Sequence, residues 1–123
     1  MAIQTGTART RELLKKIDRS NVKDPEDIMM LIMEVFKEEV LYPEPGKFYT
    51  FVYNPKTPEI EYDQHPLIAC TELQKWGFIA FNFHWRQLRQ YTWEEVSGKL
   101  HIVKYTELDE LLSLQYGKFR LNK

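Results

Sequence analysis

Cysteine is nearly absent from this chain, because Cys70 is the only one among 123 residues. A disulfide framework within the chain is therefore excluded. Cys70 lies in the apolar run Leu67-Ile68-Ala69-Cys70-Thr71, where a lone cysteine is usually a small buried apolar side chain rather than a reactive thiol. Glycine is also scarce, with five residues, and the chain contains neither common type of glycine-rich phosphate loop.

The chain also lacks long apolar runs and an excess of charge of one sign. No run approaches the ~20 apolar residues that a membrane-spanning helix needs, and the polar, basic N-terminus lacks the apolar core of a signal peptide. We therefore expect the protein to be intracellular when it is made. The net charge of −1 gives no overall field that would draw the protein to nucleic acid or to a membrane.

The charges are nevertheless unevenly distributed. Residues 9–19 hold five basic side chains against two acidic ones, and residues 26–44 hold six acidic side chains against one basic one. A basic arm followed by an acidic segment suits a protein that assembles with itself or docks on another, although the same asymmetry occurs in proteins that do neither.

Recognisable catalytic and metal-binding motifs are missing as well. The three histidines are His65, His84 and His101, and none lies in a paired metal-binding motif. Asp63 and His65 could place two ligands on one strand face, but a turn aspartate followed by a core or capping histidine is the favoured interpretation. Cys70 and His84 could face each other across a hairpin, but nothing in the sequence specifies that arrangement. We predict no catalytic residue, no metal site and no cofactor, and expect a non-enzymatic protein.

Aromatic residues, by contrast, are concentrated in one stretch. Residues 77–93 contain six aromatic side chains, one histidine and two arginines. We assign Phe81 and Phe83 to the core, because large aromatic side chains dominate core energetics. The residues at the exit of this strand are then left for the surface, where Trp and Arg are typical interface anchors. They are His84, Trp85, Arg86 and Arg89.

Helix signals dominate the first third of the chain. A thin apolar stripe, Leu13, Leu14 and Ile17, predicts a polar helix over residues 7–17 with Thr10 as its N-cap. Such a stripe cannot hold a helix alone, so this helix must dock on this chain or on another. Asp24-Pro25-Glu26-Asp27 predicts the start of a second helix, which we expect to run to about Leu41.

Strand signals follow, and then short helices. The expected strands cover residues 47–53, 60–62, 67–71, 78–83 and 100–105. Tyr49, Phe51 and Tyr53 should share one face of the first of these strands. After Trp85 the pattern predicts a helix with a capping box at Thr92 and Glu95, and a last helix should begin near Leu108.

The length is typical of one structural domain. We expect an α+β fold with a helical arm and helix over residues 1–44 and a compact β-barrel-like region over residues 45–123. A few short strands do not form an open flat sheet with two exposed edges. The predicted architecture is therefore a small, partly open antiparallel barrel of SH3-like type, with N-terminal helices and short C-terminal helices.

Two kinds of binding surface are compatible with these residues. A protein contact would use His84, Trp85, Arg86 and Arg89 together with Leu13, Leu14 and Ile17 of the first helix. The alternative is a nucleic-acid contact, in which cations neutralise phosphates and neighbouring aromatics stack on bases. Its basic residues would be Arg9, Arg11, Lys15, Lys16, Lys56, Arg86 and Arg89.

Three spaced motifs give the chain a resemblance to a known group of proteins. They are Pro45-Gly46-x-x-Tyr49-x-Phe51-x-Tyr53-x-Pro55-Lys56-Thr57, Tyr62-Asp63-x-x-Pro66-Leu67 and Gly77-Phe78-x-x-x-Asn82-x-His84-Trp85. In this order they resemble a family of small, uncharacterised proteins of contractile-tailed bacteriophages, including phages of cyanobacteria. The resemblance covers residues 45–93 and supplies no catalytic residues.

The resemblance implies a bacteriophage virion or assembly protein of the neck, tail or baseplate, acting through protein–protein contacts. Other phage structural proteins or further copies of the chain would be its partners, and no membrane is expected. It would lie in the host cytoplasm during assembly and then in the virion. The alternative it leaves open is a DNA-binding protein that acts in genome packaging or in protection of the DNA end.

Overall fold

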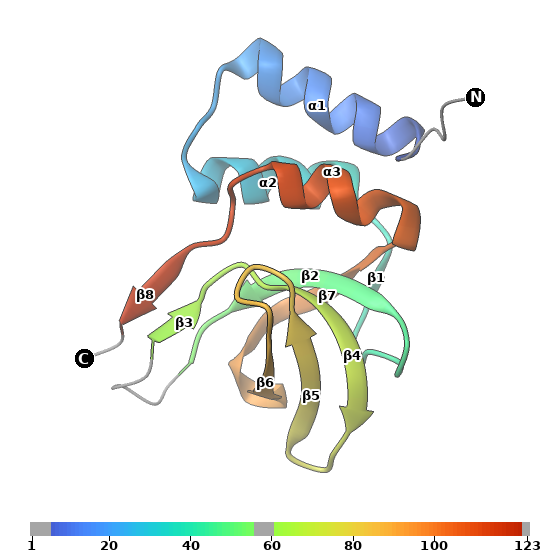
Figure 1. Ribbon diagram of the computed structural model, residues 1–123, viewed down its shortest axis with the longest axis vertical. Helices are drawn as coiled ribbons and strands as arrows, with labels where there is room; N and C mark the ends of the chain where they lie inside the picture. Colours follow the sequence, from blue (N-terminus) through green and yellow to red (C-terminus); the bar gives the residue numbers. More distant parts are fainter. Residues whose placement is uncertain (1–5, 56–60, 122–123) are drawn as a thin grey trace.

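The computed structural model describes residues 6–55 and 61–121. In these residues the fold is α+β, with three α-helices on one side of a curved sheet of six antiparallel strands (Figure 1). The helices are α1 (Ala8–Ser20), α2 (Pro25–Val35) and α3 (Leu108–Ser113). The strands of the sheet are β1 (Glu39–Val40), β2 (Phe48–Tyr53), β4 (Leu67–Leu73), β5 (Gly77–Asn82), β6 (Gln87–Thr92) and β7 (Val96–Val103).

The sheet has the strand order β1-β7-β2-β4-β5-β6 and is not closed into a barrel. Its edge strands, β1 and β6, each pair with one neighbour only. A separate two-stranded ribbon joins β3 (Glu61–Asp63) to β8 (Phe119–Leu121). Two 3-10 turns, η1 (Trp93–Glu95) and η2 (Tyr105–Glu107), precede β7 and α3. The ribbon places residues 119–121 beside residues 61–63, which lie just before β4.

The starts of the first two helices follow from local capping. Asp24 is the N-cap of α2, as predicted, and its carboxylate accepts a hydrogen bond of 2.8 Å from the Glu26 N–H. Thr7, rather than Thr10, is the N-cap of α1. Thr10 is the third residue of that helix, and its hydroxyl accepts a hydrogen bond from the Thr7 N–H at 2.8 Å. Both threonines therefore belong to one capping box, Thr7 as the N-cap and Thr10 as the third helical residue. The prediction of Thr10 as the N-cap was wrong by one turn.

The end of α2 lies at Val35 rather than near Leu41. Directly after the helix, the Phe36 carbonyl accepts a hydrogen bond of 2.7 Å from Nδ1 of His101. Residues 39–40 then pair with β7 as strand β1. The chain therefore leaves the helix for the sheet edge well before Pro43 and Pro45, the residues that were expected to stop it.

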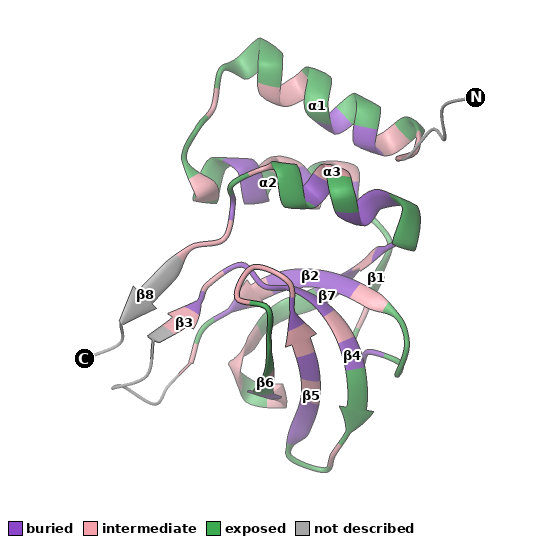
Figure 2. Ribbon diagram, in the orientation of Figure 1, coloured by how far each residue is buried: buried purple, intermediate pink, exposed green. Residues whose placement is uncertain are grey.

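Buried residues lie on the helices and along the strands (Figure 2), and their side chains form two clusters. Between helices and sheet lies the helix-side core, formed by Leu13, Ile28, Met29, Ile32, Phe36, Leu67, Val103, Leu108, Leu111 and Tyr116. The concave side of the sheet holds the inner core, formed by Tyr49, Phe51, Tyr53, Ile68, Cys70, Phe78, Ala80, Tyr91 and Leu100. The helix-side core draws on both residues 1–44 and residues 45–123, so these two segments share one core. Cys70 is buried, as expected from its apolar surroundings.

Strand β5 presents the opposite face to the inner core from the one predicted. Phe78, Ala80 and Asn82 are buried, whereas Phe81 and Phe83 are only half-buried on the other side. The concave face is crowded by large rings, such as Phe51, whose centroid lies 6.0 Å from that of Phe78. The small Ala80 fits between such rings, and the bulkier Phe81 takes the roomier outer face.

Residues 87–92 form strand β6 rather than part of a helix. They pair with β5 along its whole length, from Asn82 opposite Gln87 to Gly77 opposite Thr92. The capping-box spacing at Thr92 produces only the single 3-10 turn η1. Long-range pairing with β5 therefore overrides the local helix signal of this segment.

Candidate functional site

The corner between β5 and β6 is fixed by one asparagine side chain. The Asn82 Oδ1 atom accepts hydrogen bonds from the N–H groups of His84, at 2.8 Å, and Trp85, at 3.1 Å. The Asn82 carbonyl accepts a third from the Arg86 N–H, at 2.7 Å. This closure leaves Arg86 in the left-handed region, at φ 57°. The corner is therefore a defined turn, in which a residue other than glycine holds a costly conformation.

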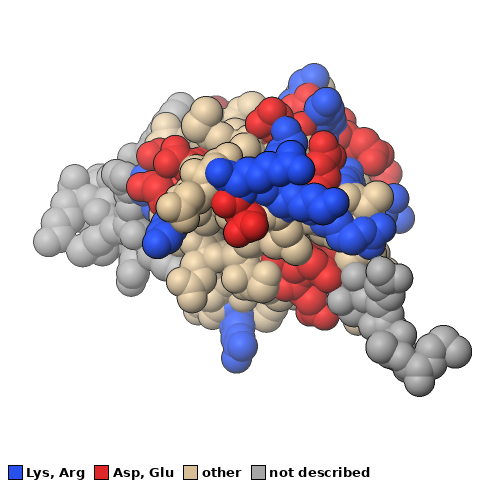
Figure 3. All heavy atoms as spheres, turned by 90° about the horizontal axis from the view of Figure 1, so that it is seen from above, with Lys and Arg blue, Asp and Glu red and all other residues tan. Residues whose placement is uncertain are grey.

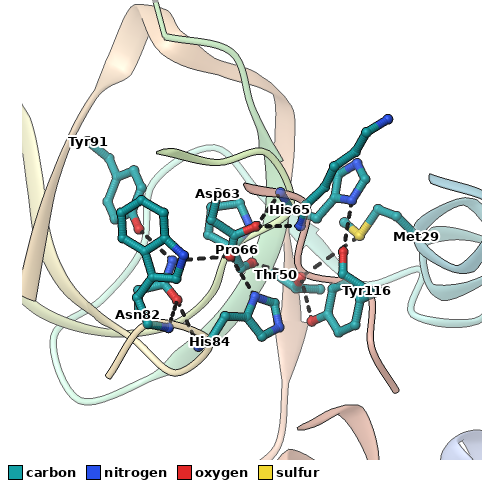
Figure 4. A network of polar contacts seen from close by, with 11 residues as sticks. Met29, Thr50, Asp63, His65, Pro66, Asn82, His84, Tyr91 and Tyr116 are labelled. Atoms are coloured by element: carbon teal, nitrogen blue, oxygen red, sulfur yellow. Dashed lines mark hydrogen bonds and ion pairs between the residues drawn. The ribbon is translucent and has the colours of Figure 1, made fainter. Parts of the chain in front are cut away.

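Asp63 connects this corner to the rest of the fold (Figure 4). Its buried carboxylate accepts hydrogen bonds from Nδ1 of His84, at 2.5 Å, and from the Asn82 amide, at 3.3 Å. The other carboxylate oxygen accepts from the N–H groups of His65 and Lys118, each at 3.0 Å. One side chain therefore joins the start of β4, the hairpin corner and the segment before β8. Four donors offset the cost of burying its charge.

The network continues to the helix-side core. His65 donates from Nδ1 to the Tyr116 carbonyl at 3.1 Å, and the Tyr116 hydroxyl lies 3.0 Å from the Thr50 hydroxyl. Burial lowers the pKa of His65, although the bond to Tyr116 acts in the opposite direction. Burial likewise raises the pKa of Tyr116. These groups are therefore held neutral, as structural links rather than as acids and bases poised near neutral pH.

The His84 ring contacts two side chains inside the fold. Besides its bond to Asp63, the ring packs edge-on against Tyr116, with centroids 4.8 Å apart. Within the described residues no group of three or more His, Cys, Asp or Glu side chains could hold a metal ion. Asp63 and His65 adopt the turn geometry favoured from the sequence, because the Asp63 carboxylate binds the His65 N–H.

An apolar groove of about 800 Å³ lies beside the corner, with the corner as one wall. Its apolar surface comes from Phe81, Phe83, Leu112 and Leu114. The side chain of Arg86 also lines the groove. The side chain of Arg86 is exposed, and it forms no hydrogen bond or ion pair with the described residues. We refer to this hollow as the corner groove.

A second pocket, of about 540 Å³, lies by the edge strand β6. Its walls include Tyr53, Tyr62, Trp76, Arg89 and Glu95. Burial, together with the nearby Glu95 carboxylate, raises the pKa of Tyr53 to about 12. The phenol therefore stays protonated at neutral pH, and its hydroxyl lies 3.5 Å from that carboxylate. Thr92, which also lines this pocket, donates a hydrogen bond to the same carboxylate.

The structure places the predicted exit residues at different depths. The His84 side chain is 8% exposed and belongs to the Asp63 network. Trp85 is half-buried beneath Arg89, whose guanidinium carbon lies 4.3 Å from the centroid of the tryptophan ring. Arg86 is exposed. Of these four, His84 and Arg86 border the corner groove, and Arg89 lines the second pocket.

The stripe on α1 is used mainly inside the chain. Leu13 is 1% exposed and belongs to the helix-side core, and Ile17 packs partly against that core. Leu14 is 37% exposed. Helix α1 therefore docks on α2 and α3 of its own chain. The prediction that Leu13 contacts a partner was wrong, because its side chain is already covered.

The basic residues of the nucleic-acid alternative separate into two groups. Arg9 binds the buried Glu107 carboxylate through Nε at 2.7 Å and Glu38 at 3.3 Å, so it serves as an internal link rather than as a surface cation. Lys16 pairs with Glu34 at 3.5 Å. Arg11 and Lys15 are exposed on α1, and Arg86 and Arg89 lie as described above. Lys56 lies outside the described residues.

Sequence reasoning missed Asp63 as the centre of the network and α3 as a wall of the groove. For the groove a signal exists. Leu108, Leu111 and Leu112 of α3, with Leu114 directly after it, are more leucines than one face of a six-residue helix can bury. Leu112 is indeed 39% exposed. For Asp63 the only local signal is the Asp63-Gln64-His65 turn, which does not reveal contacts to residues far along the chain.

No protein-family model, curated protein or solved structure matches this chain. None of the described helices is both long enough and apolar enough to cross a membrane.

Proposed function

We propose that this chain is a non-enzymatic assembly protein of a contractile-tailed bacteriophage, acting at the neck, tail or baseplate through protein–protein contacts. It would gather in the host cytoplasm during assembly and remain in the finished virion. The motif resemblance over residues 45–93 suggests the phage origin, and the corner groove is the feature that supports a contact role.

The observation that carries this proposal is the presence of an apolar hollow on a rigid support, with an arginine on its wall. The groove has apolar walls, formed in part by Phe81, Phe83 and Leu112. An apolar side chain of a partner can be buried between such walls. Arg86 adds an exposed cation at a backbone conformation that an arginine rarely adopts. Such conformations persist where the surrounding structure enforces them, and they cluster at functional sites. Arg is also among the residues most enriched at interface hot spots.

A likeness to small SH3-like barrels belongs to the same proposal. The six-stranded sheet curls around its own aromatic inner core, as the strands of such barrels do around theirs. The helices would then be additions on the outer face that leave the hairpin corner free for contacts.

Quantifying the chain in purified particles tests the proposed role. An antibody or mass-spectrometric assay of gradient-purified virions should detect it at a constant number of copies per particle. Its absence from finished virions and from assembly intermediates alike would refute a structural role. A non-structural protein of the same phage, assayed on the same gradients, provides the control for contamination.

DNA binding remains a second candidate because of the outer face of α1. Arg11, Lys15 and Arg19 are exposed and recur every four residues, so they lie along one side of the helix. Figure 3 looks onto this face and shows Lys and Arg side chains running across it, with acidic side chains nearby. A row of cations at this spacing could follow a phosphate backbone in packaging or in end protection.

A salt titration distinguishes this candidate. If α1 contacts phosphates, DNA affinity falls steeply with salt, and Lys15→Gln lowers the slope of log K against log salt by ~0.9. The matched control is Lys99→Gln, because Lys99 is exposed on β7 outside this row. Undetectable binding at low salt, or equal effects of the two substitutions, would remove the DNA-binding candidate.

A further inference from the structure

The surface of the chain carries an apolar, acidic segment whose chemistry complements the corner groove. Leu41 and Tyr42, in the connection between β1 and β2, are 64% and 63% exposed. Glu44 follows them, exposed, and its carboxylate forms no hydrogen bond or ion pair with the described residues. Two apolar side chains and a carboxylate are what a hollow with apolar walls and an exposed arginine can bind. We call residues 41–44 the acidic tip.

The backbone of the acidic tip is held in place. The Glu44 N–H donates a hydrogen bond of 2.9 Å to the Tyr49 hydroxyl. The Tyr42 ring meets the Trp93 ring edge-on, with centroids 5.1 Å apart. Pro43 and Pro45 limit the torsion angles on either side of Glu44. A segment that is already ordered loses little conformational entropy on binding, which favours its use as a contact element.

The tip and the groove belong to different parts of the sheet. The tip follows β1, at one edge of the strand order, whereas the groove lies on β5, the hairpin corner and the end of α3. The two share no residue. A contact between the tip of one copy and the groove of another is therefore heterologous, and each bound pair still offers one free tip and one free groove.

We propose that the corner groove receives the acidic tip of a second copy of this chain, with Arg86 facing Glu44 of that copy. This inference rests on the proposed assembly function and names one partner for it. Repetition of the contact produces closed rings or open filaments, depending on the rotation between neighbours.

The test is sedimentation velocity of the full chain and of two exposed variants. The wild type should form species that grow with concentration, above the chain mass of 14.8 kDa. Leu112→Asp alters only the groove, and Leu41→Asp alters only the tip. Each variant alone should self-associate at least about tenfold more weakly than the wild type. Met30→Asp is the matched control, since Met30 is 62% exposed on α2 outside both surfaces, and it should assemble as the wild type does.

Mixing the two variants separates this contact from a symmetric one. The intact tip of Leu112→Asp fits the intact groove of Leu41→Asp, and the mixture should stop at a dimer of one copy of each. A mixture that remains monomeric overturns the inference. The inference is also overturned if either single variant assembles as strongly as the wild type. Circular dichroism of each variant confirms that the loss of assembly does not come from unfolding.

A charge exchange tests the specific pair. Arg86→Glu and Glu44→Arg should each weaken self-association alone, because like charges then meet in the contact. An equal mixture should recover assembly, since each kind of copy presents the opposite charge to the other. Failure to recover would overturn the pairing of Arg86 with Glu44. A wild-type chain that is monomeric at every concentration, yet present in virions, would overturn self-assembly while leaving the proposed function intact.

Discussion

Arg86 combines an unfavourable backbone conformation with an exposed charge beside an apolar surface. At φ 57°, a side chain with a Cβ atom costs about 1–2 kcal/mol relative to glycine. The turn itself would be satisfied by glycine, and the contact proposed for the Arg86 side chain outside its own chain would account for the arginine.

Replacing this arginine separates stability from contact. We expect Arg86→Gly to raise the free energy of unfolding by about 1 kcal/mol, because glycine adopts the left-handed region freely. Arg86→Ala removes the same charge but keeps a Cβ atom, and it should bring no such gain. Urea denaturation of the three proteins measures the difference. A loss of stability in Arg86→Gly would show that the arginine side chain supports the fold itself.

Gly77 is required for a different reason, which is space rather than torsion. A Cβ atom at this position would lie 1.9 Å from the Tyr91 carbonyl oxygen across the β5–β6 pair. We expect Gly77→Ala to cost about 3 kcal/mol, at the upper end for overpacking. Gly98→Ala is the control, because it meets nothing within 4 Å and carries only the torsional cost of φ 80°, about 1 kcal/mol. Equal losses in urea denaturation would contradict the steric explanation.

At the scale of elements, the attachment of α1 depends on one buried carboxylate. Glu107 is fully buried and receives hydrogen bonds from Arg9, at 2.7 and 2.8 Å, and from the Lys104 N–H, at 2.8 Å. The Arg9 guanidinium also lies 4.3 Å from the centroid of the Phe36 ring. Helix α1 is thereby joined to η2 and to the end of α2.

This attachment makes the free energy of unfolding depend on pH in the acidic range. Burial acts to raise the pKa of Glu107, but the hydrogen bonds from Arg9, Thr7 and Lys104 outweigh it and hold the pKa below its ordinary value of 4.5. The stabilisation is complete above the unfolded pKa and is lost as the pH falls through the folded one.

We expect Glu107→Gln to cost about 3 kcal/mol at pH 7, since it leaves Arg9 without its main partner. The variant should also lose less stability than the wild type as the pH falls below 4.5. Urea denaturation over a range of pH measures both effects. Parallel stability–pH curves for the two proteins would contradict the role assigned to this carboxylate.

The elements that sequence patterns identify are those with local causes. Asp24 and Pro25 set the start of α2 through groups within one turn, and this start was predicted correctly. Its end was not, because it depends on the His101 bond to Phe36 and on pairing of residues 39–40 with β7. Strand β6 was missed for the same reason, since its partner β5, rather than its own pattern, determines its conformation.

At the scale of the whole molecule, the α+β class was predicted and is confirmed, whereas closure into a barrel is not observed. Of the residues predicted at the exit of the aromatic strand, His84 and Arg86 border the corner groove. The opposite wall of the corner groove could not be predicted, because Leu112 and Leu114 come from a part of the chain that only the tertiary fold brings near Arg86. Asp63 likewise gathers its four donors from three segments that have no common sequence signal.

The central claim is that the groove of one copy binds the tip of the next, and disulfide trapping tests it most directly. Cys70 is buried and is the only native cysteine, so Leu41→Cys and Leu112→Cys each add one exposed thiol. Under mild oxidation, an equal mixture of the two variants should produce a covalent dimer that contains one copy of each. If that dimer is no more abundant than in a mixture of Met30→Cys with Leu112→Cys, the claim is contradicted.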